Sequence, residues 1–533
     1  MTWLVPLIVL IPLTGSALTL TAGRRQRLQI FIASATMVCS VLVAAGMLLA
    51  VHLGDAPLVV QVGGWAAPFG ISLVVDRLAA LMVLVSSIVL LAVMTFSIGQ
   101  GSADEADEGV HDNETPVSIF YPTYLVLAAG VFNAFIAGDL FNLFVGFEIL
   151  LVSSFVLITL GGTVTRIRAG VTYIIVSLVS SVLFLLAIGL IFGATGTVNM
   201  AAVSTRMSEL PQGVQLMLHL MLLIGFAIKA ALFPLSFWLP DSYPSAPAPV
   251  TAVFAGLLTK VGVYAILRTE SLIFAANDIS VLLMVVAIAT MLVGIFGAVT
   301  QAGIRRMLSF TLISHIGYMI FGIALGNEAG WSATVYYTVH HILVQATLFL
   351  VTGLIERVAG TSTITHLGGM LKRAPLVAAL FFIPMLNLGG IPPFSGFIGK
   401  LALFIAGAEG TALAAPQWLV WTAIGIGAAT SLLTLYALIR VWNLGFWREL
   451  DEVGDVESPL TVLLEEEPGA DIVKDERRNS TLMTSATGAL VATTIALTVF
   501  AGPIFAIAEA AGANLRHPAE YINAVTDVEG AKP

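Results

Sequence analysis

The stretch GFAIKAALFPLSFWLPDSYPSAPAPVTAVFAGLLTKVGVYAILR, residues 225–268, places two lysines inside apolar sequence. Lys229 and Lys260 each lie in a run long enough to cross a bilayer, which takes about 20 apolar residues. An ionisable side chain at that depth costs from about 2.5 to more than 10 kcal/mol unless it is paired, hydrated or part of an ion path. Pro234 follows Lys229 and removes a backbone donor, so it predicts a break in that helix.

Two further ionisable residues lie in apolar sequence elsewhere in the chain. Glu148 lies in FNLFVGFEILLVSSF, and Lys400 lies in GGIPPFSGFIGKLALF. Pro392 and Pro393 precede Lys400 and predict a second broken helix. Discontinuous helices beside buried charges are typical of ion sites near the bilayer midplane. Together with the two lysines above, these residues indicate a route for protons or cations across a membrane.

The composition of the 533-residue chain indicates an all-α polytopic membrane protein. Hydrophobic residues make up 58% of it and charged residues 10%, whereas a soluble domain carries about 25% charged residues. The apolar runs are continuous and lack the period-two alternation of transmembrane β-strands. The net charge is −9 and there is no basic patch for nucleic acid. Cys39 is the single cysteine, so an intrachain disulfide is excluded.

The apolar windows predict about fourteen transmembrane helices, of which the seventh and twelfth contain the prolines. Because the two broken helices are five spans apart, spans 4–8 and 9–13 are expected to form two inverted five-helix repeats. The alternative is that the prolines produce ordinary kinks. The predicted spans are 3–21, 28–52, 72–98, 118–138, 141–160, 169–193, 214–239, 246–267, 279–300, 304–325, 331–355, 374–406, 416–444 and 482–510.

This pattern divides the chain into five parts. Residues 1–117 contain the first three helices and an acidic loop at 103–114. The two repeats occupy 118–267 and 279–444. A hydrophilic loop follows at 445–481, and the last helix with its tail occupies 482–533. With the N-terminus outside, the inner loops collect most of the lysines and arginines, as the positive-inside rule requires. An even number of spans then places the C-terminus outside as well.

Three stretches resemble the antiporter-like subunits of respiratory complex I and of Mrp-type multisubunit sodium/proton antiporters. They are GDLFNLFVGFEILLVSSF (138–155), the 225–268 stretch quoted above, and LGGIPPFSGFIGK (388–400). The chain is most similar to the MrpD branch, because its length suits fourteen spans and because Lys400 stands where a complex I subunit carries glutamate.

The resemblance implies a proton-translocating subunit of a heteromeric Na⁺(Li⁺/K⁺)/H⁺ antiporter in a bacterial cytoplasmic membrane. Its partners would be the other Mrp-type subunits and the lipid bilayer, with protons and Na⁺ as the transported ions and with no cofactor or metal. The alternative within the same superfamily is an antiporter-like proton-pumping subunit of respiratory complex I or of a membrane-bound hydrogenase. A purely structural subunit and a self-sufficient transporter are the remaining alternatives.

The resemblance assigns Glu148 and Lys229 to an ion pair that controls a proton site. Desolvation favours the neutral form of a lone buried lysine, and a nearby carboxylate favours the charged form. An approaching Glu148 would therefore keep a proton on Lys229, and separation of the pair would release it. The alternative is a static salt bridge between two helices.

The resemblance continues this line through further positions. Lys260 would connect the two half-channels, with snorkelling to the interface as the alternative. Lys400 would end the second half-channel, with capping of the broken helix's free carbonyls as the alternative. His341 would relay protons between the two lysines, because histidine titrates near neutral pH. His340 and His315 are lower-ranking relay candidates, and packing is the alternative for all three histidines.

Two acidic residues are expected to have structural roles instead. Asp139 precedes the fifth span and is expected to cap it. Asp76 and Arg77 are expected to form an interfacial pair at the start of the third span. The sequence contains no phosphate loop, no zinc-ligand spacing and no cysteine cluster, so the energy for transport is expected to come from an ion gradient or from partner proteins.

Overall fold

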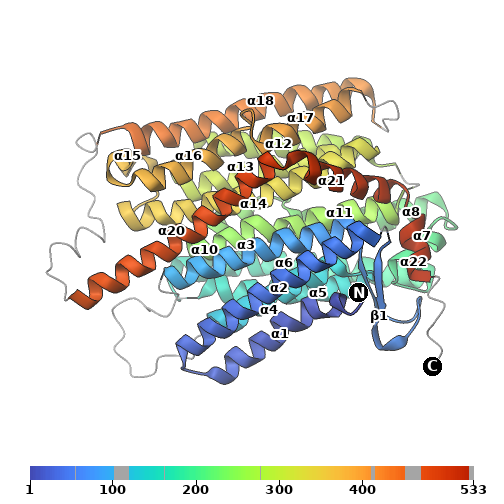
Figure 1. Cartoon of the computed structure of the whole chain (residues 1–533). Helices are drawn as coiled ribbons and strands as arrows, with labels where there is room; N and C mark the ends of the chain where they lie inside the picture. The colour runs from blue at the N-terminus through green and yellow to red at the C-terminus, as the bar shows by residue number, and fades with distance from the viewer. Residues whose placement is uncertain are drawn as a thin grey trace.

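The computed structural model describes residues 1–54, 56–100, 119–160, 162–275, 278–409, 415–449 and 470–526. Within these ranges, twelve helices are long and apolar enough to cross a membrane, and shorter apolar helices accompany them. Figure 1 shows the helices side by side in one bundle, with a two-stranded hairpin at one end. The predicted class, a polytopic all-α membrane protein, is confirmed.

Each predicted span overlaps at least one observed helix. The first helices are α1 (Leu4–Ala22), α2 (Gln26–Gly54), α3 (Arg77–Gly99), α4 (Phe120–Ile136), α5 (Leu140–Thr159), α6 (Val164–Thr195), α7 (Met200–Met207) and α8 (Gln212–Ala230). The next are α9 (Leu239–Ser242), α10 (Ala248–Val253), the π-helical η3 (Phe254–Leu258), α11 (Thr259–Leu272), α12 (Ser280–Thr300), α13 (Ile304–Ala324), α14 (Glu328–Ala359) and α15 (Met370–Arg373). The last are α16 (Pro375–Gly389), α17 (Ser395–Ala408), α18 (Gln417–Val441), the π-helical η5 (Trp442–Trp447), α20 (Ala470–Val499), α21 (Ala501–Arg516) and α22 (Ala519–Thr526).

The start of the third predicted span is a strand, so the predicted boundary at residue 72 is wrong. Strand β2 (Ser72–Val75) pairs antiparallel with β1 (Leu58–Gln61), with Leu58 opposite Val75. Helix α3 begins only after Asp76, whose carboxylate accepts a hydrogen bond from the backbone N–H of Ala79 at 2.8 Å. An aspartate in this position satisfies an N–H that the first helical turn leaves free. The cap and the strand pairing together set the beginning of α3.

The expected interfacial pair between Asp76 and Arg77 does not form. Asp76 instead pairs with Arg268 of α11, with Oδ2 and Nη1 2.6 Å apart. Arg77 donates a hydrogen bond to the side-chain carbonyl of Asn514 in α21 at 2.7 Å. Residues adjacent in the sequence point in different directions at a helix start, so each reaches a different distant helix.

Both helix breaks occur where the prolines predict them. Helix α8 ends before Ala231, which has a left-handed φ of 57°, and Pro234 lies in the non-helical stretch that follows. Helix α16 ends before Gly390, with φ of 79°, and Pro392 and Pro393 lie between α16 and α17. Proline cannot donate to the helix ladder and clashes with the preceding turn. Each break therefore leaves backbone carbonyl groups inside the bundle, close to one of the candidate lysines.

The C-terminal part of the chain differs from the predicted boundaries. Helix α20 begins at Ala470, inside the stretch 445–481 that was expected to be a loop. It ends at Val499, and Phe500 separates it from α21, so the predicted span 482–510 is two helices. Figure 1 shows these red helices lying across the bundle, where α20 contacts α3 and α21 contacts α14. Residues 450–469 and the acidic segment 103–114 lie outside the described residues.

The most buried helices carry Lys260 and the three histidines. The membrane window of 248–272 is 100% buried and those of α13 and α14 are 94% and 83% buried, whereas that of α6 is 39% buried. Helix α14 packs against α3, α13, α16, α17, α20 and α21. Helix α6 exposes large apolar side chains such as Ile175 and Val182, as a lipid-facing helix does. The charges on α11 and the histidines on α13 and α14 therefore lie inside protein.

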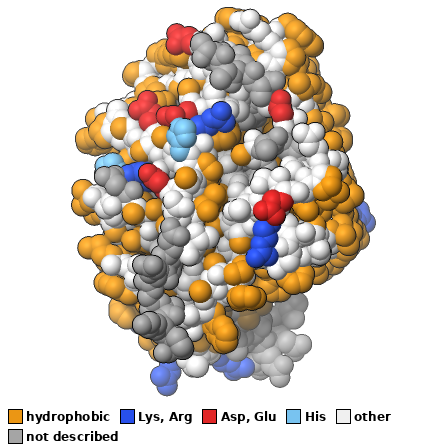
Figure 2. Space-filling view, turned by 90° about the vertical axis from the view of Figure 1, so that its right-hand side faces the viewer, with side chains coloured by type: hydrophobic (Ala, Val, Ile, Leu, Met, Phe, Trp, Pro, Cys, Tyr) orange, Lys and Arg blue, Asp and Glu red, His pale blue; other side chains and the backbone are white. Residues whose placement is uncertain are grey.

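One end of the bundle is polar. It carries the hairpin, α7, α22 and the N-terminus (Figure 1). Viewed from this end, acidic, basic and histidine side chains lie among uncharged polar surface, and hydrophobic side chains cover the flanks (Figure 2). This distribution fits a bundle whose flanks face lipid and whose end faces water.

Candidate functional site

Glu148 and Lys229 lie close to the first helix break, but they are not in contact. Lys229, in the last turn of α8, donates through Nζ to the hydroxyl of Ser181 at 3.1 Å and to the carbonyl of Ser177 at 3.5 Å. In the described part of the chain no ion pair joins Lys229 to Glu148, and Oε1 of Glu148 is buried without a hydrogen-bond partner. Glu148 still lies within electrostatic range of Lys229. The structure therefore holds the two residues apart.

A small cavity lies beside Lys229. Its volume is ≈ 30 Å³, and its walls include Lys229, Ser177 and Tyr173, together with Leu258 of the π-helical turn η3. A buried water needs roughly 10–15 Å³ of such space and two to four polar partners. The ammonium group of Lys229, the hydroxyl of Tyr173 and the carbonyl of Ser177 are partners of that kind. The cavity can therefore hydrate Lys229 on the side that leads to η3.

Lys260 follows the π-helical turn and is wholly buried. Its exposed fraction is 0%, and its Nζ donates to the carbonyl of Ala255 within the turn at 2.5 Å. A π-turn leaves a backbone carbonyl without its usual helical partner and is frequent at functional sites. The side chain of Lys260 does not reach the surface, which contradicts the snorkelling alternative.

Lys400 contacts the second helix break directly. Its Nζ donates to the carbonyl of Leu388, at the end of α16, and to the hydroxyl of Ser431 in α18, each at 2.9 Å. The same Nζ lies 5.4 Å from the centre of the Tyr318 ring. Lys400 thus caps one carbonyl that the break leaves free, which is the structural alternative considered for it. The contact does not exclude proton transfer, because a lysine that donates to neutral partners can still release a proton.

The three histidines lie together near Lys400, and two of them also lie near Lys260. His315 of α13 and His341 of α14 have ring centres 5.1 Å apart. His340 reaches the second break, where its Nδ1 lies 3.0 Å from the hydroxyl of Ser395. Both lysines lie within electrostatic range of His341 and of His315. The structure thus places His315 and His341 between the two lysines and His340 beside Lys400 and the second break.

The histidines differ in how their ring nitrogens are satisfied. All three are 0% exposed. Nε2 of His340 and both nitrogens of His341 have no hydrogen-bond partner within the described residues. Both nitrogens of His315 have partners, which are the hydroxyls of Tyr337 and Thr434. Unpartnered buried nitrogens are the ones that water or a transferred proton can reach.

Four residues whose hydroxyl groups lie beside this cluster were not predicted from the sequence: Tyr318, Tyr337, Ser431 and Thr434. Tyr337 precedes His340 and His341 by three and four residues, and Tyr318 follows His315 by three, so each tyrosine shares a helix face with a histidine. Helical spacing alone was therefore a signal for these two tyrosines. Helix α18 contributes the hydroxyl groups of Ser431 and Thr434. No sequence pattern indicated these two residues, because only the packing of α18 against the other helices brings them to the site.

Two further polar residues, His219 and Asp139, have structural contacts outside this line. His219 pairs with Glu270 at 2.5 Å and stacks on Phe274 with ring centres 4.1 Å apart. These contacts hold α8 against the end of α11 and the residues that follow it. Asp139 accepts a hydrogen bond from the backbone N–H of Asn142 at 2.8 Å, which confirms the predicted cap of α5.

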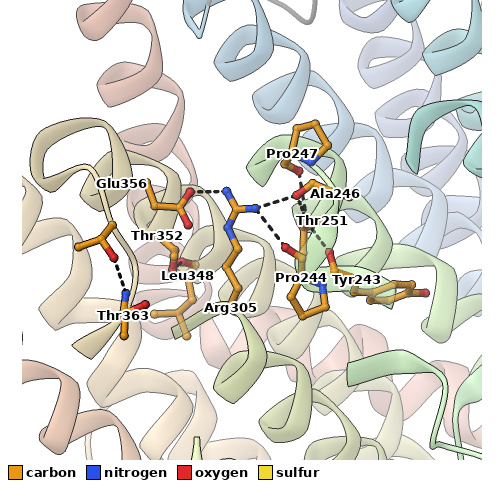
Figure 3. Close-up of polar contacts among 11 residues, drawn as sticks. Tyr243, Pro244, Ala246, Pro247, Thr251, Arg305, Leu348, Thr352, Glu356 and Thr363 are labelled. Carbon is orange, nitrogen blue, oxygen red and sulfur yellow. Dashed lines mark hydrogen bonds and ion pairs between the residues drawn. The ribbon is translucent and has the colours of Figure 1, made fainter. Parts of the chain in front are cut away.

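Arg305, at the start of α13, joins the second half of the chain to the first. Arg305 pairs with Glu356 and also donates to the carbonyls of Pro244 and Ala246, at 3.3 and 2.7 Å (Figure 3). The hydroxyl of Thr251 lies 2.8 Å from the carbonyl oxygen of Tyr243 and 3.1 Å from that of Ala246 in the same turn (Figure 3). The arginine therefore fixes the turn after α9, and with it the start of the buried segment that carries Lys260.

In the described part of the chain no group of three or more histidine, cysteine or acidic side chains comes together to hold a metal ion. The clustered residues are instead lysines, histidines, tyrosines and hydroxyl groups. These are side chains that accept, hold and pass on protons.

Comparison with known proteins places the chain in a family. The profile of the NADH:quinone oxidoreductase/Mrp antiporter transmembrane family matches residues 137–434, a range that includes Glu148, the three lysines and the three histidines. The chain is 38% identical to the Na(+)/H(+) antiporter D subunit of Alkalihalophilus pseudofirmus, over 84% of this chain and 87% of the relative. It is 35% identical to the protein of the same name from Bacillus subtilis, over 83% and 87%.

A solved structure agrees with these relatives. A chain of the Mrp complex from Dietzia sp. DQ12-45-1b matches with a TM-score of 0.85 and 31% identity, and the match covers 98% of this chain and 99% of that one. The chain therefore belongs to the NADH:quinone oxidoreductase/Mrp antiporter family and, within it, to the group of Na(+)/H(+) antiporter D subunits.

Proposed function

We propose that the chain is the proton-translocating subunit of a heteromeric Mrp-type Na⁺(Li⁺/K⁺)/H⁺ antiporter. The observation that carries the proposal is the buried series of proton-accepting side chains that runs from Lys229 through Lys260 and the histidines to Lys400. The names of the D-subunit relatives and the Mrp complex that contains a similar chain support the same function.

Protons move through Glu148, Lys229, Lys260, His341 and Lys400 in this mechanism. Approach of Glu148 stabilises the charged form of Lys229, and separation of the two favours release of the proton. The separated arrangement in the structure corresponds to the releasing state. The small cavity beside Lys229 supports water-mediated transfer toward η3 and Lys260.

The second half of the path runs through the histidine cluster. His341 offers two unpartnered nitrogens within the described residues, and His340 offers one. His341 is the main relay between Lys260 and Lys400, and His340 and His315 are secondary relay groups. Lys400 delivers the proton at the second break, beside Ser431 and the carbonyl of Leu388.

The rest of the antiporter lies in partner subunits. The D-subunit relatives and the matched Mrp complex support assembly with other Mrp-type subunits. The complex resides in a bacterial cytoplasmic membrane with the N- and C-termini of this chain outside. The distribution of lysine and arginine between loops supports this orientation.

Residues 118–267 and 279–444 form two inverted repeats in this proposal. The support is a matching contact in each half. An antiparallel bridge joins Asp139, before α5, to Asn199, after α6. A second one joins Gly303, before α13, to Thr363, after α14. In each half the next long helix is the broken one, which places a lysine beside each of two equivalent breaks.

The test replaces Lys229 by alanine in the complete complex. Antiport by everted membrane vesicles, followed with a pH-sensitive dye, is expected to fall by roughly 10²-fold or more, because a positioned proton-transfer group contributes about that much. Lys372→Ala is the matched control, since Lys372 lies on the surface and pairs with Glu449 at 2.8 Å. Parental antiport from a fully assembled Lys229→Ala complex would remove Lys229 from the path.

Gly390 gives a second test of the proposed path, at the other break. A Cβ on this residue would lie 3.1 Å from Nζ of Lys400, and φ is 79°. Gly390→Ala is expected to lower antiport several-fold, because it displaces the ammonium group and costs about 1–2 kcal/mol in backbone strain. Gly196→Ala is the control, because Gly196 has a similar φ of 69° but its added Cβ meets Arg206 only at 3.4 Å. Equal antiport rates for the two variants would contradict the role of Lys400.

A further inference from the structure

A chain of hydrogen bonds runs through His315 from α14 to α18. The hydroxyl oxygen of Tyr337 lies 2.7 Å from Nδ1 of His315, and Oγ1 of Thr434 lies 3.4 Å from Nε2. All three side chains are fully buried. Each ring nitrogen of His315 therefore has one hydroxyl partner, and the protons in this chain have few possible arrangements.

The direction of each hydrogen bond follows from the proton of Thr434. A hydroxyl group has one proton to donate. The carbonyl of Thr430 lies 2.8 Å from Oγ1 of Thr434 and Nε2 of His315 lies 3.4 Å from it, so the threonine proton goes to the nearer acceptor and Thr434 accepts from His315. Nε2 of neutral His315 therefore carries the ring proton and Nδ1 carries a lone pair. Tyr337 must then donate its hydroxyl proton to Nδ1.

The same argument gives a different result for His340. Ser395 donates its proton to Oδ1 of Asn387 at 3.1 Å, and therefore accepts from Nδ1 of His340 at 3.0 Å. The backbone N–H of Gly396 also donates to Oδ1 of Asn387, at 2.9 Å, which identifies that atom as the amide oxygen. Nε2 of His340 keeps a lone pair with no partner among the described residues, so it is open to a proton.

We propose that Tyr337 is a positioning residue that closes Nδ1 of His315 and makes proton uptake there dependent on rotation of the tyrosine hydroxyl. The inference rests on the proposed function. Because Nε2 already carries a proton, a second proton can bind only at Nδ1. The tyrosine hydroxyl must first turn away, keeping its own proton, and the ring then gains one proton from a neighbouring relay group or water. His340 and His341 need no such rotation.

Six ionisable side chains lie near His315 within the described residues. Those that act on it electrostatically or contact its ring are Lys260, Lys400, His340, His341, Tyr318 and Tyr337. Helix α12 packs along α13 and contributes no ionisable side chain. On α18, Tyr436 is exposed, and Arg440 donates to the carbonyls of Val299 and Gln301. Both hydrogen-bond partners of His315, Tyr337 and Thr434, are uncharged hydroxyl groups. Deleting either hydroxyl therefore changes the hydrogen bonding of His315 without removing a charge.

Two substitutions test the proposed proton arrangement because they have opposite expected effects. Tyr337→Phe frees the lone pair on Nδ1, so His315 takes a proton more readily. The midpoint of the acidic limb of the antiport activity curve is expected to move to higher pH by about half a unit or more. Thr434→Val deletes the hydroxyl oxygen that accepts a hydrogen bond from Nε2–H. This hydrogen bond stabilises the charged ring more than the neutral ring, so its loss is expected to move the same midpoint to lower pH.

The control is Tyr336→Phe, at the neighbouring position. The hydroxyl of Tyr336 donates to the carbonyl of Leu497 at 3.5 Å, away from the histidines, and its loss is expected to leave the curve unchanged. Shifts of the reversed sign would show the other tautomer, and two curves that match the Tyr336→Phe control would remove His315 from the cycle. Either result overturns the inference while the parental complex still exchanges ions. Absence of antiport from the parental complex would instead overturn the proposed function itself.

Discussion

Replacing Lys260 by methionine is expected to reduce antiport by roughly 10²-fold while the assembled complex stays as stable as the parent or becomes more stable. Lys260 is fully buried, and its ammonium group donates to the carbonyl of Ala255. A buried charge with few partners is costly, and replacing buried charges with apolar side chains of similar volume is often neutral or stabilising. A proton-transfer group, in contrast, contributes about 10²–10⁴-fold to a rate.

The experiment measures antiport in everted vesicles and the thermal midpoint of the purified complex for the same variant. Thr259→Val is the control on the same helix, because Thr259 is equally buried and its hydroxyl has no partner within the described residues. It is expected to retain parental antiport. Loss of assembly in Lys260→Met, with normal assembly in the control, would show that Lys260 serves the structure and not transport.

Replacing Asp76 by leucine is expected to lower the stability of the complex strongly, whereas Lys260→Met is expected to leave it unchanged or raise it. Asp76 and Arg268 form a buried ion pair 2.6 Å apart, with side chains 8% and 4% exposed. Removing one partner of such a pair costs about 3–5 kcal/mol, because the other charge stays buried and unpaired. The substitution also deletes the cap of α3, which is worth about 1 kcal/mol. A lower thermal midpoint and a lower yield of complex are the expected observations.

Two companion variants separate these effects. Asp76→Asn keeps an acceptor for the cap and removes only the charge. Asp76→Leu combined with Arg268→Met removes both charges and is expected to recover part of the stability. The matched surface pair is Asp241 with Arg306, 2.9 Å apart and with side chains 67% and 51% exposed, where Asp241→Leu is expected to cost less than about 1 kcal/mol. Equal losses at the two pairs would contradict a special role for burial.

The contrast between these two predictions separates buried charge that supports structure from buried charge that supports transport. Arg268 is held by a carboxylate and by the ring of Tyr521, whose centre lies 5.2 Å from it. Lys229, Lys260 and Lys400 donate to hydroxyl groups and carbonyls and have no carboxylate partner in the described structure. An arginine that stays charged suits a permanent pair, and a lysine with neutral partners can change its protonation state.

The sequence was sufficient to predict most of the helices and both breaks. Hydropathy depends on local composition, and proline acts on the turn in which it lies, so Pro234, Pro392 and Pro393 predicted the interruptions correctly. The strand at residues 72–75 was missed because its four residues continue the hydropathy of α3. The division between α20 and α21 was missed because the apolar run continues across Phe500, although Pro503, in the first turn of α21, was a signal for a helix start.

In the candidate site, the sequence predicted the ionisable residues but not the residues that contact them. Buried lysines, a buried glutamate and paired histidines are visible in the sequence, because any charge in an apolar run is exceptional. The partners of these groups are not visible. Lys400 meets Ser431, and His315 meets Tyr337 and Thr434, through contacts between different helices. Such contacts depend on how each helix is rotated about its axis, which hydropathy does not specify.

The amino-acid sequence by itself determined the membrane class, the approximate spans, the two breaks and the list of buried ionisable groups. Each follows from local physics, which is the cost of charge in lipid and the loss of a helical hydrogen bond at proline. Only the tertiary structure decided that Glu148 and Lys229 stand apart, that Asp76 pairs with Arg268, and that the hydroxyl groups of Tyr337 and Thr434 meet the two ring nitrogens of His315. These properties come from packing between distant helices, because a hydrogen bond forms only where two side chains meet at the right distance and angle.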